Sequence, residues 1–190
     1  MNDSMTLCGP PPRKGRRRSL FPICMTAARP EFDTLPVMKV THYPLEPRDY
    51  KPFAQGIVAV DPRRLYLRLW AFETPPEPES RILLVLRHAG RTLTAAAGPE
   101  GVSAALDGAP CAPLACHPFT GDDLQGRYWG WLAEYPADLL GELAPGDSLT
   151  GNLYKCSDGR RPHLGSFFPM ADPSRPLSPE NDGAFVLRPF

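Results

Sequence analysis

The chain has 190 residues, including 25 prolines and 16 glycines, and its formal net charge is zero. Proline cannot occupy helix interiors, and the longest stretch free of both residues runs only from Arg63 to Thr74, so an all-α bundle and a fold with repeated crossover helices are excluded. Hydrophobic residues make up 42% of the chain, which argues against disorder throughout, and no apolar run reaches the roughly 20 residues of a membrane span.

Basic residues concentrate in the first part of the chain, between residues 13 and 18, and leave the remainder mildly acidic. An acidic body gives no electrostatic footprint for nucleic acid, so no nucleic-acid or membrane partner is expected. Pro22 interrupts the only stretch that could serve as the apolar part of a signal peptide, and the odd number of cysteines favours free thiols. We therefore expect a cytoplasmic protein with a basic, proline-rich, disordered segment over residues 1–35 and one domain over residues 36–190.

Residues 64–72 alternate with the period of two that is typical of a strand. Leu65, Leu67 and Leu69 fall on one face, whereas Tyr66, Arg68, Trp70 and Phe72 fall on the other. Further strands are predicted, in chain order, at residues 55–60, 81–88, 91–96, 101–106, 126–134, 148–156, 163–168 and 184–187, and one short helix is predicted at residues 136–143. The pattern predicts an all-β fold, an antiparallel β-sandwich of about eight to ten strands.

No motif for nucleophilic catalysis or phosphate binding is present, so no catalytic residue is assigned. Paired carboxylates carry out glycoside hydrolysis, which keeps a small glycoside hydrolase as the least favoured alternative. Its candidate acids, by residue type alone, are Glu73, Asp122, Asp123 and Glu134.

The sequence Tyr128-Trp129-Gly130-Trp131 is the most informative aromatic group. On a strand, Trp129 and Trp131 share one face and Tyr128 lies on the other. Such rings either stack on a ligand or pack in the core of a sandwich, and the pattern alone leaves both open.

The last part of the chain carries a distinctive series of residues. It consists of Gly146 to Cys156, with Gly151-Asn152-Leu153-Tyr154-Lys155 at its centre, then His163 to Met170 with Phe168-Pro169, then Asp182 to Leu187. This series resembles the C-terminal half of the family 9 carbohydrate-binding-like modules, within the wider DOMON-like group. The match is mainly over residues 119–187, with weaker similarity from about residue 40.

The resemblance implies a β-sandwich that binds saccharide ends between two aromatic rings, without a cofactor but with structural Ca²⁺ in some members. Carried over by position, Trp70 or Trp129 forms one wall of the binding site. Phe168 stands where sugar-binding relatives often have Trp, and Tyr154 and Lys155 supply polar contacts. No metal ligand is assigned, because no compact calcium loop is present.

These observations predict a non-enzymatic module that binds a saccharide or a related small ligand. The alternative, a cytoplasmic interaction or scaffold domain that kept the fold without the sugar site, is favoured by the absence of an export signal and by Phe168 in the place of Trp.

Overall fold

The computed structural model describes residues 20–45 and 53–190. Within them it contains thirteen strands and two single-turn 3-10 helices, η1 (Phe32–Thr34) and η2 (Pro179–Asn181). The strands are β1 (Phe21–Met25), β2 (Met38–Lys39), β3 (Phe53–Val60), β4 (Arg64–Phe72), β5 (Arg81–His88), β6 (Arg91–Gly98), β7 (Gly101–Leu106), β8 (Ala109–Pro110), β9 (Ala115–Asp123), β10 (Gly126–Pro136), β11 (Ser148–Ser157), β12 (His163–Ser166) and β13 (Gly183–Pro189). The predicted all-β class is confirmed.

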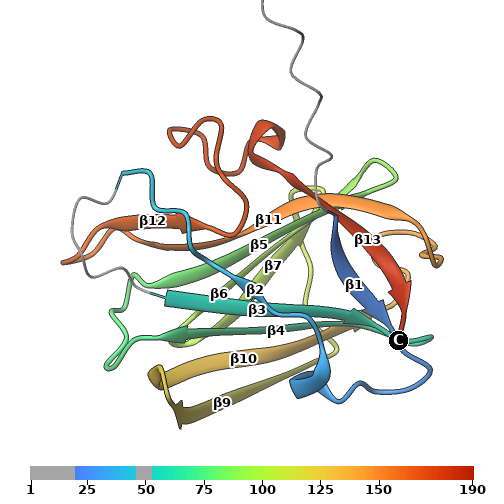
Figure 1. Cartoon of the computed structure of the whole chain (residues 1–190), viewed down its shortest axis with the longest axis horizontal. Helices are drawn as coiled ribbons and strands as arrows, with labels where there is room; N and C mark the ends of the chain where they lie inside the picture. The colour runs from blue at the N-terminus through green and yellow to red at the C-terminus, as the bar shows by residue number, and fades with distance from the viewer. Residues whose placement is uncertain (1–19, 46–52) are drawn as a thin grey trace, which may run out of the picture.

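The strands form one continuous sheet that curls over on itself into two layers (Figure 1). Its order is β8-β7-β6-β5-β11-β13-β1-β3-β4-β10-β9, with β12 paired to β11 and β2 paired to β3. Among the described strands, β1 alone pairs in parallel, with β13 on one side and β3 on the other, so it joins the two layers. The predicted antiparallel β-sandwich is thus present, with parallel pairing only on the two sides of β1 among the described strands.

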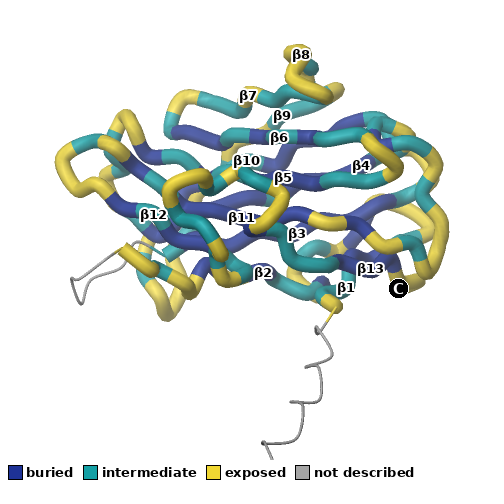
Figure 2. The backbone as a smooth tube through the Cα atoms, turned by 90° about the horizontal axis from the view of Figure 1, so that it is seen from above, coloured by how far each residue is buried: buried dark blue, intermediate teal, exposed yellow. Residues whose placement is uncertain are grey.

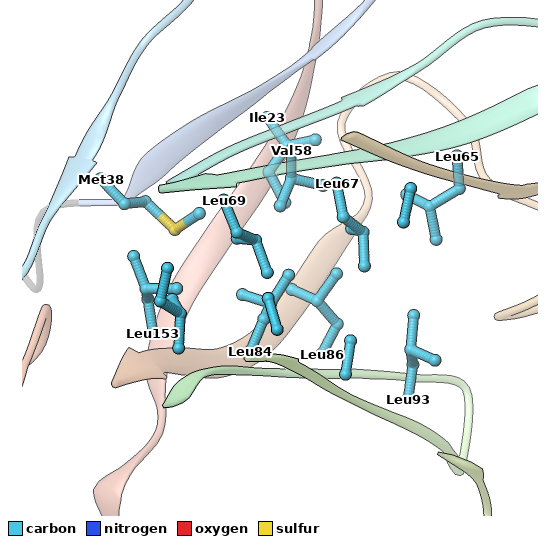
Figure 3. Packing of buried hydrophobic residues seen from close by; sticks show 14 of the residues in the cluster. Ile23, Met38, Val58, Leu65, Leu67, Leu69, Leu84, Leu86, Leu93 and Leu153 are labelled. Carbon is cyan, nitrogen blue, oxygen red and sulfur yellow. The ribbon is translucent and has the colours of Figure 1, made fainter. Parts of the chain in front are cut away.

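The apolar faces of the two layers meet in one core (Figure 3). Leu65, Leu67 and Leu69 of β4 face inward toward Leu84 and Leu86 of β5, as the alternation predicted, and these side chains are at most 1% exposed. Burial of this continuous apolar surface is the main favourable contribution to folding. In Figure 2 the buried segments run through the middle of the strands, and exposure is concentrated in the loops and at β8.

A second apolar cluster lies on the outer face of the β3-β4-β10-β9 layer. Tyr66, Trp70 and Phe72 belong to it, and the segment between β1 and β2 covers part of it with Phe32 and Leu35. The second face of β4, which carries Arg68 among its aromatic side chains, is thus largely covered.

Two predictions from the sequence are wrong: the start of the domain at residue 36 and the short helix at residues 136–143. The fold starts before residue 36, because β1 is a central strand whose Ile23 side chain is 1% exposed. The predicted disorder of residues 1–19 lies outside the described residues.

The helix predicted at residues 136–143 is absent, since β10 runs on to Pro136 and a series of turns follows, ending at Gly141 with φ of 90°. Neither described 3-10 turn has the length or apolarity that a membrane-crossing helix requires.

Gly130 of β10 lies where β4 and β9 leave no room for a side chain. A Cβ atom there would lie 2.6 Å from Trp70 Cβ and 2.7 Å from Phe119 Cζ. We predict that Gly130→Ala lowers the free energy of unfolding by about 2–3 kcal/mol, as expected for overpacking. Gly101→Ala is the matched control, because nothing lies within 4 Å of its Cβ position, and it should stay within about 0.5 kcal/mol of wild type in the same urea titration. Equal losses for the two variants would contradict the described packing.

Candidate functional site

Three connections come together at one end of the sandwich, at the left in Figure 1. They are the segment from Glu73 to Ser80 between β4 and β5, the hairpin that joins β9 to β10, and the hairpin that joins β11 to β12. The residues Glu73–Pro78 are called the Glu73–Pro78 loop below. This loop lines two neighbouring cavities, so it is the centre of the candidate site.

Beneath the loop lies the ammonium group of Lys155, whose side chain is 0% exposed. Its Nζ donates to Ser80 Oγ at 2.6 Å, lies 3.1 Å from His163 Nε2 and forms an ion pair with Glu73 Oε2 at 3.3 Å. Ser80 Oγ in turn donates to Glu73 Oε2 at 2.6 Å. A buried cation is costly unless it is paired and hydrogen-bonded, and here every available donor direction has a partner.

The alternation of β11 explains why a lysine is buried here. Lys155 falls on the same face of the strand as Leu153, which is in the core, but two residues closer to the end of the sheet. The core ends there and the polar loop begins. The methylene groups of Lys155 therefore stay in the apolar interior while its ammonium group reaches Glu73. Burial lowers the pKa of Lys155, and the Glu73 carboxylate opposes that effect.

His163 completes this group from β12. Its Nδ1 lies 2.7 Å from the carbonyl oxygen of Arg161, so Nδ1–H donates there and Nε2 is left to accept from Lys155. Burial, together with the neighbouring ammonium, lowers the pKa of His163. The imidazole is therefore held neutral in a single tautomer.

The first cavity, of about 350 Å³, lies directly outside this buried group. The Glu73–Pro78 loop forms one side, and Arg160, Arg161 and His163 form the other. Four charged residues and three prolines line it, and the imidazole of His163 is the only aromatic ring that borders it among the described residues.

The second cavity, of about 520 Å³, lies on the other side of the loop and is lined by aromatic and polar groups together. Tyr128 and Trp129 provide the rings, and Tyr128 lies across Gly121, where a Cβ atom would collide with its ring. The polar groups belong to Glu73, Thr74, Thr120, Asp122 and Arg127. Trp129 is 8% exposed, and its Nε1 is buried without a hydrogen-bond partner among the described residues.

The structure does not bring the five residues predicted for ligand binding to one place. Trp129 lines the second cavity. Trp70 is opposite Gly130 in the register of β4 and β10, so it lies on the outer face of the layer, whereas Trp129 lies on the inner face opposite Ala71. Lys155 is buried under the Glu73–Pro78 loop, and only its partners Glu73 and His163 line a cavity.

Tyr154 and Phe168 belong to the neighbourhood of the loop after β12. The Asn152 side chain bonds the backbone N–H and the carbonyl of Phe168 and the carbonyl of Asn181, which fixes this loop on β11. The Phe168 ring packs over Gly183 and 5.3 Å from the ring of Phe185. Tyr154 is 0% exposed, and burial raises its pKa to about 12.

Sequence reasoning did not assign Glu77, Arg127, Arg160 or Arg161 to a site. It also did not identify Tyr128 as part of a cavity wall. All five lie in or beside connections between predicted strands. The sequence marks the Glu73–Pro78 loop by three prolines in four residues and the β11–β12 connection by adjacent arginines, but it does not show that these connections meet.

The described strands form a two-layered β-sandwich, and solved structures of similar fold include a family 9 carbohydrate-binding module. The chain is similar, at 16% identity and a TM-score of 0.65, to a candidate carbohydrate-binding protein from Bacteroides uniformis, over 90% of this chain and 100% of that one. It is also similar, at 11% identity, to a family 9 module from Caldicellulosiruptor kristjanssonii solved with cellotriose (TM-score 0.58, 89% and 94% covered) and with glucose (TM-score 0.60, 89% and 96% covered). No family model matches the sequence, and no curated protein matches it. The predicted resemblance in fold is confirmed.

The Glu73–Lys155 pair gives an asymmetric prediction for stability. Glu73→Gln leaves the buried ammonium without its counter-ion and should lower the free energy of unfolding by about 3 kcal/mol or more. Lys155→Met should cost less, because it removes the buried charge and leaves the Glu73 carboxylate bonded to Ser80 at the edge of an open cavity. Urea unfolding of both variants at pH 7 measures the difference, and a Lys155→Met loss that exceeds the Glu73→Gln loss would contradict the assignment.

Neutral His163 gives a prediction for pH dependence. Its folded-state pKa lies below the ordinary value near 6.5, so as the pH falls through 6.5 the unfolded chain takes up a proton before the folded chain does. The stability it contributes is complete above pH 6.5 and is lost below it, with a slope of at most about 1.4 kcal/mol per pH unit. Between about pH 7.5 and pH 5.5 in urea titrations, wild type should therefore lose more stability than His163→Gln. Parallel curves would show that His163 is not held neutral.

Proposed function

We propose that this chain binds carbohydrate without catalysis, in the second cavity between the Glu73–Pro78 loop and the β9–β10 hairpin. The observation that carries the proposal is that Tyr128 and Trp129, which lie on opposite faces of β10, and several charged residues all border one open cavity of about 520 Å³. This volume falls within the range of small-molecule sites, roughly 300–1,000 Å³.

The chemistry of the lining suits a sugar ring. A pyranose has an apolar face of C–H groups that packs against an aromatic ring, here that of Tyr128 or the small exposed part of Trp129. Its hydroxyls both donate and accept hydrogen bonds. Glu73 and Asp122 accept such bonds and Arg127 donates them, and hydrogen bonds to charged groups are among the stronger ones.

Lys155 supports the proposed site as a positioning residue. Its ammonium and the Ser80 hydroxyl both engage the same oxygen of Glu73, Oε2, which fixes the carboxylate at the boundary of the two cavities. A preoriented acceptor loses little conformational entropy when a ligand binds. A family 9 module of similar fold has been solved in complex with cellotriose and in complex with glucose. A saccharide is therefore the first ligand class to test.

We expect glucose, cellotriose or another member of a mono- and oligosaccharide panel to release or absorb heat in calorimetric titrations at millimolar concentration. Arg127→Ala and Asp122→Ala should each weaken the binding at least about tenfold, since a charge-assisted hydrogen bond contributes roughly 1.5–3 kcal/mol. Both side chains are well exposed, at 73% and 66%, so the variants should keep the wild-type fold.

Arg91→Ala is the matched control. Arg91 forms an ion pair of similar length with Asp107, 3.7 Å against 3.6 Å for Arg127 and Asp122, and it lies at the opposite end of β5 from the proposed site. It should leave the affinity unchanged. The proposal fails if no saccharide in the panel gives heat, or if Arg91→Ala weakens binding as much as Arg127→Ala does.

A further inference from the structure

A third cavity, of about 460 Å³, lies on the outer face of the β4-β10-β9 layer. Its floor is formed by Arg68 of β4, Leu132 of β10 and Phe119 of β9, and the segment from Arg29 to Asp33 forms its wall. None of its lining residues lines the second cavity, so the two are separate sites.

The guanidinium of Arg68 is held in this cavity by three aromatic rings. Its Cζ lies 5.1 Å from the ring centroid of Phe119, 5.5 Å from that of Trp70 and 5.7 Å from that of Phe32. These distances are those of cation–π contacts, which Arg makes more often than Lys does. The ring of Phe119 can approach Trp70 because Gly130 between them has no side chain. The guanidinium is therefore fixed in one orientation before any ligand arrives.

The donors of this guanidinium are mostly unused. Of the five N–H groups of an arginine, those of Arg68 make one hydrogen bond within the described residues, from Nη1 to Asp33 Oδ1 at 2.7 Å. The Arg68 side chain is 23% exposed, but that of Asp33 is 92% exposed. An ion pair with so exposed a partner contributes little, so the Asp33 carboxylate is an easily displaced occupant.

The remaining lining adds apolar surface and further charge. Phe32, Pro118 and Leu132 give the cavity apolar walls. Arg29 is also at its rim and pairs with Glu134 at 3.3 Å, while Glu31 and His117 complete the charged and titratable groups that line it. A ligand that suits this arrangement has a carboxylate for Arg68 and an apolar face for the rings.

We propose that the cavity around Arg68 binds small ligands that carry a carboxylate, by exchange of the Asp33 carboxylate for that of the ligand. Two sources share this chemistry, an acidic sugar such as a uronate and a simple organic acid. Because the cavity shares no residue with the second cavity, this inference stands or falls independently of neutral-saccharide binding there.

The test compares two substitutions that remove the same charge. Asp33→Asn removes the internal competitor and should tighten the binding of glucuronate or propionate roughly twofold to fivefold, the range that an exposed ion pair represents. Glu180→Gln removes an exposed acid that pairs with Arg175 in the loop after β12, and it should leave the affinity unchanged. Calorimetric titrations at pH 7 with glucuronate, propionate and glucose give the affinities.

Arg68→Gln should abolish carboxylate binding, and Asp33→Asn should leave the affinity for glucose unchanged. If Arg68→Gln does not fold, the comparison of Asp33→Asn with Glu180→Gln still decides. Tightening of glucuronate alone assigns the site to an acidic sugar, and tightening of both acids assigns it to the carboxylate itself; either supports the proposal. It is overturned if Asp33→Asn binds neither acid at millimolar concentration, if it binds them no more tightly than Glu180→Gln does, or if a folded Arg68→Gln variant keeps wild-type affinity.

Discussion

The end of the sandwich that holds the candidate site depends on one buried charge. The ammonium of Lys155, on β11, must be neutralised where it lies, and its partners come from three other places: Glu73 after β4, Ser80 before β5 and His163 on β12. An unpaired ammonium in this position would cost several kcal/mol. The electrostatic requirement thus fixes both ends of the connection from Glu73 to Ser80, which contains the Glu73–Pro78 loop.

The position of that loop decides which surfaces become available to a ligand. On one side it faces the arginines of the β11–β12 connection, and on the other it faces the rings of the β9–β10 hairpin. Glu73 borders both cavities while its Oε2 stays engaged below. The same group therefore stabilises the fold and presents a carboxylate at the surface. The curl of the sheet around β1 is what brings β4 and β10 of one layer over β5 and β11 of the other.

Most of the fold could be predicted from the sequence because burial of the central strands requires alternating or continuous apolar residues along them. The strands at residues 64–72, 81–88 and 101–106 have the predicted bounds. Strand β9 was missed because it is an edge strand, where Pro118 and exposed polar residues are tolerated and the alternation is lost. Strand β1 was missed because the basic, proline-rich composition before it masks a short segment whose burial depends on pairing with β13 and β3, which are distant in sequence.

The candidate site was less predictable, because it consists of loops. Periodicity correctly placed Tyr128 and Trp129 on opposite faces of β10, but it could not show that Trp70 lies across the sheet from Trp129. Lys155 was predicted to contact ligand directly. Its spacing of two from the core residue Leu153 was the signal that it points inward, and only the neighbouring loop explains how a charge is accommodated there.

The most direct measurement is the movement of the tryptophan indole N–H resonances when saccharide is added to the ¹⁵N-labelled protein. The three indoles differ in environment: Trp129 borders the second cavity with its N–H unpartnered among the described residues, Trp131 donates to the carbonyl of Gly98, and Trp70 lies on the outer face. Saccharide binding as proposed predicts a saturable shift of the Trp129 resonance, with those of Trp70 and Trp131 nearly still. A stationary Trp129 resonance at saccharide concentrations that shift Trp70 or saturate the calorimetric signal would contradict the account.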